Sequence, residues 1–208
     1  METNRETKNY YAPKEILDQV LHTGKNKGEQ TILYMLLMGF LAGAFIAFAA
    51  EGSNMATFNL FAEADTYGLG RVLAGAIFTS GLILVLLAGG ELFTGNMLMI
   101  GSVLDKKIAF SAMIRNWAFV YMGNFLGSLV IVYLIFLSGL LSSGDGLLGG
   151  ITIKIAVSKV GFGFLQAVSL GILCNWLVCL AVWMCHGAKD FAGKIMAIFF
   201  PIMLFVTY

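Results

Sequence analysis

Long runs without acidic or basic residues alternate with short charged segments along this chain. Residues 30–50 form 21 uncharged positions between Glu29 and Glu51, and residues 116–144 and 160–188 form comparable runs. About 20 apolar residues, at about 1.5 Å of rise each, cross a bilayer core of about 30 Å as a helix. Each of these three runs therefore predicts a membrane-spanning helix.

The second apolar run is longer than the others and contains a charge. Residues 72–104 would extend about 50 Å as one straight helix, and Gly-Gly-Glu-Leu-Phe-Thr-Gly-Asn occupies positions 89–96. Backbone that leaves the helix at membrane depth is tolerated where protein buries it or where it lines a cavity. The run predicts a helix that breaks near Glu91 and restarts near Thr94, with the Thr94 hydroxyl as N-cap. A structural kink with a satisfied Glu91 is the alternative.

The two ends of the chain carry shorter apolar patterns. Residues 195–208 form a run of 14, which reaches about 21 Å and is too short to cross the bilayer alone. We therefore expect the chain to stop inside the membrane on its fifth pass, and the natural protein to continue. At the other end, residues 12–23 place Ile16, Leu17, Val20 and Leu21 on one helical face. This predicts a surface helix at the cytoplasmic mouth, with a mobile gate as the sharper alternative.

Composition supports membrane insertion. The 208 residues are 59% hydrophobic and 12% charged, whereas soluble domains carry about 25% charged residues. Ten of the 13 Lys and Arg residues fall on the side of the membrane that holds the N-terminus, which predicts a cytoplasmic N-terminus in the plasma membrane, the inner membrane of a bacterium. We expect a cytoplasmic segment over residues 1–29 and a membrane domain over residues 30–208. The net charge of +1 argues against nucleic acid as a partner.

Small residues and candidate ligands complete the pattern. Gly39 and Gly43, like Gly123 and Gly127, are four positions apart and favour close helix packing. The three cysteines fit no metal or disulfide spacing, so we expect neither a metal nor a cofactor. We interpret both histidines, at positions 22 and 186, as interfacial or solvated residues.

An ordered set of motifs resembles one family of membrane proteins, the formate/nitrite transporters. The resemblance covers the chain from about residue 12 to its end. It rests on Glu91–Asn96, Arg115-Asn116-Trp117, Tyr121-x-Gly123-Asn124, Ser158-Lys159-Val160, Leu170–Met184 and Pro201–Val206. It implies an all-α, aquaporin-like membrane bundle with broken helices 2 and 5, assembled as a homopentamer with one pore in each subunit. In this chain the end of helix 5, with the family's central histidine, and helix 6 are missing.

The resemblance also implies roles for individual residues. Thr94 would lie at the centre of the pore, and Lys159 would draw anions inward. The alternative for Lys159 is a lysine that enters a membrane helix and snorkels to the interface. The apolar constrictions would be formed by Phe78, Leu82, Leu92, Phe93 and Phe205. Support for the broken helix and its surroundings would come from Glu91, Gly95, Asn96 and Asn175.

The expected function is passage of small monovalent anions, formate or nitrite first, with a proton as a possible companion. Hydrosulfide is an alternative anion within the same family. A channel for neutral solutes and an intramembrane enzyme using Glu91 are further alternatives. The paired Asn-Pro-Ala motifs of aquaporins are missing from the sequence. Glu91 has no recognisable catalytic partner, so we predict that the protein is not an enzyme.

Overall fold

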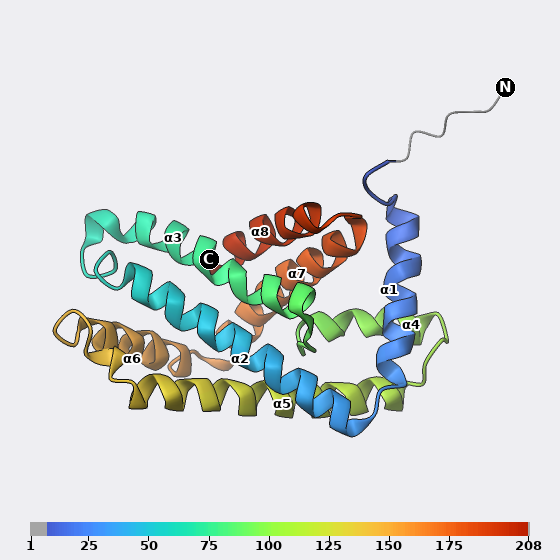
Figure 1. Cartoon of the computed structure of the whole chain (residues 1–208), viewed down its shortest axis with the longest axis horizontal. Coiled ribbons are helices and arrows are strands. Elements are labelled where there is room, and N and C mark those ends of the chain that lie inside the picture. Colours follow the sequence, from blue (N-terminus) through green and yellow to red (C-terminus); the bar gives the residue numbers. More distant parts are fainter. Residues whose placement is uncertain (1–7, 208) are drawn as a thin grey trace.

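The computed structural model describes residues 8–207, and long helices dominate them (Figure 1). By length and composition, four helical stretches could cross a membrane: α2 (Ile32–Thr57), Ala64–Gly89, α5 (Phe110–Leu137) and α7 (Phe164–Gly187). The second of these contains the short 3-10 helix η1 (Ala64–Thr66), α3 (Tyr67–Ile83) and the π-helical turn η2 (Leu84–Gly89). The shorter elements are α1 (Pro13–Gly28), η3 (Gly95–Leu98), α4 (Met99–Leu104), η4 (Leu140–Ser142), α6 (Leu147–Val160) and α8 (Phe191–Thr207).

The predicted spans are present, but several of their boundaries need correction. Helix α2 continues through Glu51 to Thr57, because a single charge near a helix end does not interrupt backbone hydrogen bonding. Helix α5 runs from residue 110 to 137, not 116 to 144, and the chain turns at Gly139 with a φ of +74°. The predicted fourth span loses its first residues, because the separate helix α6 ends at Val160 and α7 starts at Phe164.

Helices α2 and α5 lie side by side along much of their length (Figure 1). A Cβ atom on Gly43 would lie 2.0 Å from the carbonyl oxygen of Asn124, and one on Gly127 would lie 2.0 Å from that of Phe40. No side chain fits at such distances, so the two backbones approach as closely as glycine allows. The prediction that the small-residue pairs permit close packing is confirmed at this interface.

Helix α1 runs across the direction of α5, at the side of the bundle where α4 lies and where α2 begins (Figure 1). Its inner face contains Ile16, Val20 and Leu21, which are buried, and it packs mainly against α4 and α7, with further contacts to α5 and η3. Leu17, which the pattern placed on the same face, is 41% exposed. The helix also extends five residues beyond the predicted end at residue 23, because nothing in the following segment breaks it before Gly28.

The core of the bundle is formed where α2, α3, η2, α7 and α8 meet. It contains the buried residues Ala42, Leu82, Val85, Val178, Ala181, Cys185, Ile198 and Ile202. The outward faces are also apolar, with Phe136, Phe164 and Trp176 at least 66% exposed. An apolar core inside an apolar surface is the arrangement expected for helices surrounded by lipid or by further helices.

Helix α8 packs against α3, and the last described residues lie beside the middle of that helix (Figure 1). A Cβ on Gly75 would lie 2.7 Å from the carbonyl oxygen of Met203, so α3 and α8 also rely on glycine for close contact. This pairing brings the end of the described chain next to Phe78, whose ring centroid lies 5.9 Å from that of Phe205.

Candidate functional site

The helical path through residues 67–104 is interrupted between Gly89 and Gly95. The π-helical turn ends at Gly89 with a φ of +102°, a conformation that is strained for residues other than glycine. Gly90 is extended, and the chain resumes helical structure as η3 at Gly95 and then as α4. A Cβ on Gly90 would lie 3.1 Å from Ala42. The glycines therefore provide both the turn and the close contact with α2.

The free backbone groups of this segment are bonded by neighbouring helices. The amide of Glu91 donates to the carbonyl of Met38 in α2 at 3.0 Å. Asn124 of α5 accepts from the amide of Phe93 at 2.9 Å and donates to the carbonyls of Glu91 and Gly39, each at 2.8 Å. One amide side chain thus takes over hydrogen bonds that a continuous helix would supply internally. Non-helical backbone at membrane depth requires such partners.

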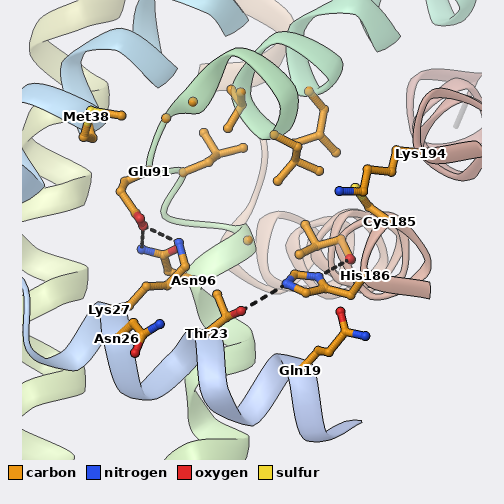
Figure 2. Close-up of a pocket in the computed structure, with 18 of the residues that line it drawn as sticks. Gln19, Thr23, Asn26, Lys27, Met38, Glu91, Asn96, Cys185, His186 and Lys194 are labelled. Atoms are coloured by element: carbon orange, nitrogen blue, oxygen red, sulfur yellow. Dashed lines mark hydrogen bonds and ion pairs between the residues drawn. The ribbon is translucent and has the colours of Figure 1, made fainter. Parts of the chain in front are cut away.

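Glu91 is only 6% exposed, and its side chain lies in a polar cluster (Figure 2). It forms an ion pair with Lys27 of α1 and accepts from Asn96 Nδ2 at 2.8 Å. Its other oxygen accepts from Gln30 Nε2 at 3.0 Å. Lys27 also donates to Asn96 Oδ1 at 2.8 Å. A buried carboxylate is stable only when paired and hydrogen-bonded, and Glu91 meets both conditions.

A second set of contacts fixes this cluster to α5 and to the end of α1. Asn116 Oδ1 accepts from Asn96 at 2.8 Å, and the Trp117 indole donates to the Asn96 carbonyl at 3.0 Å. Arg115 donates to the carbonyl of Gly28 at 2.8 Å, where a cation also complements the negative end of the α1 dipole. Three segments far apart in the sequence therefore meet at Glu91.

A cavity of about 490 Å³ opens between α1, the helix break and the adjoining ends of α7 and α8 (Figure 2). Its charged lining residues are Lys27, Lys189, Lys194 and Glu91. Three ammonium groups facing one carboxylate give this space a positive charge. At its far end the lining becomes apolar and includes Leu82 and Leu92.

Four of the five predicted constriction residues gather next to this cavity. Phe78, Leu82, Leu92 and Phe205 belong to the same apolar cluster. Phe93 does not join them. Its ring packs edge-on against Trp117 and Tyr121, at centroid distances of 6.1 and 5.3 Å.

The structure changes the interpretation of Thr94. Its hydroxyl makes no capping hydrogen bond, because the residue is itself in a helical conformation at the start of a 3-10 turn. The predicted N-cap is therefore wrong. Thr94 does not line the 490 Å³ cavity. It lines a separate space of about 270 Å³ together with Phe93, Asn124 and other residues of α2 and α5.

Two further predicted residues lie in α6 and α7. Lys159 is exposed at the end of α6, with its amine 5.4 Å from the centroid of the Phe162 ring. It precedes the spanning helix instead of entering it. Asn175 lies inside α7, and its Oδ1 is buried without a hydrogen-bond partner among residues 8–207. Gly95 packs against Val182, at 3.4 Å from a Cβ placed on it.

Sequence reasoning gave no specific role to several residues of the site. Lys27 belongs to the predicted cytoplasmic segment over residues 1–29, and Gln30 is the first residue of the predicted span over residues 30–50. Asn124 was noted only as part of a motif. His186, interpreted as interfacial or solvated, is half-buried and bonded to Thr23 and to a backbone carbonyl. The sequence feature that could have identified Asn124 is its polar side chain within an apolar run, because placing a polar side chain inside a membrane is energetically unfavourable and usually marks a functional position.

Metal-binding groups are not clustered in the described part of the chain. Within residues 8–207, no three His, Cys, Asp or Glu side chains are close enough to hold a metal ion. All three cysteines, Cys174, Cys179 and Cys185, are free thiols on α7. Cys179 approaches the Thr94 carbonyl at 3.6 Å, which is a packing contact between α7 and the break.

Comparison with known proteins gives a consistent result. The sequence profile described as formate/nitrite transporter matches residues 14–208. The formate channel BtFdhC of Bacillus thuringiensis is 41% identical over 200 residues, which are 95% of this chain and 75% of that protein. The formate channel FocA of Haemophilus influenzae is 34% identical over 195 residues, or 94% of this chain and 68% of the relative.

A solved structure agrees with these relatives. A pentameric formate channel with formate bound superposes with a TM-score of 0.74 at 35% identity, covering 85% of this chain and 68% of that one. The similarity in sequence and in fold extends over nearly the whole chain, and the named relatives are channels, not enzymes. This chain therefore belongs to the formate/nitrite transporter family, whose members carry solutes across membranes and are not enzymes.

Proposed function

We propose that this protein is a membrane channel for small monovalent anions, with formate or nitrite as the first candidates, and that it works as a homopentamer with one path in each subunit. The relatives named for formate support the anion class. The pentameric structure with formate bound supports both the assembly and the substrate.

The observation that carries this proposal is the cavity at the helix break. It combines three lysines and one glutamate with an apolar far end at Leu82 and Leu92. The positive lining raises the local concentration of anions. The cavity reaches the backbone of the broken segment. The backbone N–H and C=O groups of that segment are not left without partners, because they form hydrogen bonds with α2 and α5.

The apolar cluster beyond the cavity limits what passes. A full charge inside a space lined by Leu82, Leu92, Phe78 and Phe205 loses its hydration, and such transfers are very unfavourable for an ion. A small weak acid avoids most of this cost when it takes up a proton before it enters the cluster. We therefore include proton coupling in the proposal and expect formate or nitrite to cross as the neutral acid or as an anion–proton pair.

The remaining residues receive their proposed roles from the family resemblance. Lys159 attracts anions at the mouth opposite to α1, where its exposed amine is available. Thr94 and Asn175 are proposed as polar positions along the path. Gly95 and Asn96 hold the broken segment, an interpretation supported by the contacts of Asn96 with Glu91 and Asn116. Phe93, which the resemblance assigns to a constriction, is proposed to support the break instead, because its ring packs against Trp117 and Tyr121.

We propose that α1 and the 490 Å³ cavity face the cytoplasm. The balance of ten basic residues against three supports this orientation. Cysteines introduced at Asp65, in η1, and at Lys107, just after α4, test it with an impermeant thiol reagent, because the proposed orientation puts the two positions on opposite sides. Labelling of position 107 from outside, without labelling of position 65, would reverse the orientation.

Flux in proteoliposomes tests the function itself. We expect rapid formate and nitrite entry and no accelerated entry of glycerol, with hydrosulfide measured as a third anion. The Lys159→Glu variant should lower the anion flux at low salt and approach the wild-type flux at high salt, because salt screens exposed charges. Glycerol or water flux without formate flux would contradict the proposal.

A further inference from the structure

Lys194 has unusual surroundings for a lysine in the wall of a cavity. It lies in the first turn of α8, is half-buried, and directs its amine into the 490 Å³ cavity (Figure 2). Within residues 8–207 it forms no hydrogen bond and no ion pair through that amine. An ammonium group offers three donors, and all three are available here.

The other two lysines of the cavity already have partners. Lys27 is engaged with Glu91 and Asn96. Lys189 donates to the carbonyl of Lys8 at 2.7 Å and lies 4.6 Å from the centroid of the Tyr11 ring. The carboxylate closest in sequence to Lys194 is also engaged, since Asp190 Oδ1 caps α8 by accepting from the amide of Gly193 at 2.7 Å.

Neutral donors face the same space. His186 Nδ1 donates to the Val182 carbonyl at 2.8 Å, so in the neutral ring Nε2 accepts from the Thr23 hydroxyl at the long distance of 3.4 Å. The single hydrogen of that hydroxyl is therefore only weakly held by Nε2, and it turns away from Nε2 to donate to an anion. Gln19 lines the cavity beside these residues and is labelled with them in Figure 2. A hydroxyl and an amide are therefore placed on α1, opposite the Lys194 ammonium.

We infer that Lys194, with Thr23 and Gln19, forms a binding position for a small monovalent anion in the cavity beneath α1, before the anion reaches the apolar cluster. One unpaired ammonium suits an anion with a single charge. The weak neutral donors hold the anion without trapping it, which conduction requires. This position is distinct from Lys159 and rests on the proposed anion conduction.

The simpler explanation is that Lys194 only marks the cytoplasmic side of the membrane, as basic residues near helix ends do. The two explanations differ in what happens when the charge is removed. A topology marker can be neutralised without any effect on anions in the correctly inserted protein. Neutralising a residue that binds the anion must weaken anion binding, and the size of this effect must depend on the side of the membrane from which the anion enters.

The test compares Lys194→Gln with Lys194→Arg, which keeps the charge, and with Lys14→Gln, which removes one charge from an exposed position on α1 outside the cavity. Currents carried by sodium formate are recorded in planar bilayers at low ionic strength, with formate added to one side at a time. We expect Lys194→Gln to raise the half-saturating formate concentration about three- to tenfold from the α1 side only. Added potassium gluconate should reduce this difference. Lys194→Arg and Lys14→Gln should match the wild type.

Binding is measured separately from conduction. Sodium formate should raise the unfolding temperature of the wild type above that in sodium gluconate, and Lys194→Gln should lose most of this increase, because a ligand stabilises the state that binds it. Equal half-saturation and equal stabilisation in Lys194→Gln and Lys14→Gln would overturn the inference. A wild type that binds formate but passes none would overturn the proposed function and leave this binding position intact.

Discussion

Two glutamates are buried among residues 8–207, one in the helix break and one in α2, and their surroundings are opposite. Glu91, at the α1 end, bonds to Lys27, Gln30 and Asn96. Glu51 lies in the C-terminal half of α2 and is 9% exposed. Among residues 8–207 it accepts only from Asn54, at the long distance of 3.4 Å. Its Oε1 has no partner among residues 8–207.

The difference shows which of the two buried carboxylates has its hydrogen-bond and ion-pair partners among the described residues. A buried carboxylate with partners from three segments is a fixed part of its site, whereas a buried carboxylate without a cation is a cost to folding. The site at the break therefore has its full set of partners in this chain. Glu51 has only Asn54, whose amide also reaches Thr152 at 3.5 Å. Substitutions at the two positions should therefore act in opposite directions.

The largest effect is expected at Glu91. Replacing it by Gln removes the ion pair and leaves the Lys27 ammonium, 20% exposed, without its carboxylate. Losing one member of a buried pair costs about 3–5 kcal/mol. We expect a corresponding decrease in the unfolding temperature in detergent, followed by tryptophan fluorescence, together with loss of formate flux.

The matched control for this change is Glu29→Gln. Glu29 is 66% exposed and its oxygen lies 4.0 Å from the Lys25 amine, so its loss should change stability by about 0.5 kcal/mol or less. The double change Glu91→Gln with Lys27→Gln should recover part of the loss, because no lone charge is then left buried. Equal effects of Glu91→Gln and Glu29→Gln would mean that the buried pair is not stabilising.

The backbone of the break provides the second prediction. Asn124→Leu removes the acceptor for the Phe93 amide and the donors to the Glu91 and Gly39 carbonyls. Each buried group left without a partner costs about 1–3 kcal/mol, and partial relaxation makes about 2–3 kcal/mol a reasonable total. Ser128→Ala, one turn further along α5, removes only an exposed local hydrogen bond and should change the unfolding temperature little.

The break at Glu91 could be predicted because its signals are local. Run length, the adjacent glycines and a carboxylate within an apolar run all point to the same eight residues. The pairing of Glu91 with Lys27 could not be predicted in this way, because 64 positions separate them. Periodicity shows which face of a helix is apolar, but it does not show where a crossing helix such as α1 will lie.

Phe93 and Thr94 illustrate a second limit. Both follow Leu92 directly in the sequence, and the family resemblance assigned them to the same path as Leu92. Residues 90–94 lie outside any continuous helix or strand, so neither the period of a helix nor that of a strand fixes where successive side chains point. In the structure Leu92 joins the apolar core, whereas Phe93 contacts Trp117 on α5.

A smaller effect, of opposite sign, is expected at Glu51. Glu51→Gln keeps the shape and removes a buried charge for which residues 8–207 provide no cation. Stability should rise by up to about 1 kcal/mol or stay unchanged, since unpaired buried charges are unfavourable. A decrease of more than about 2 kcal/mol would show that Glu51 has a cationic partner in the assembled protein, and the contrast between the two carboxylates would then disappear.

The smallest effect on stability is expected at Thr94, where the break offers a hydroxyl without a capping role. Because that hydroxyl makes no cap hydrogen bond, Thr94→Val should change stability by less than about 0.5 kcal/mol. Thr31→Val is the matched control. The Thr31 hydroxyl caps α2 by accepting from the Tyr34 amide at 3.3 Å, and losing such a cap costs about 1 kcal/mol.

Formate flux should show the reverse order, with Thr94→Val reducing it and Thr31→Val leaving it near wild type, if the Thr94 hydroxyl contacts the passing anion. Unchanged flux in a stable Thr94→Val protein would remove Thr94 from the proposed path, and the cavity beneath α1 would then have to continue past Leu92 without it.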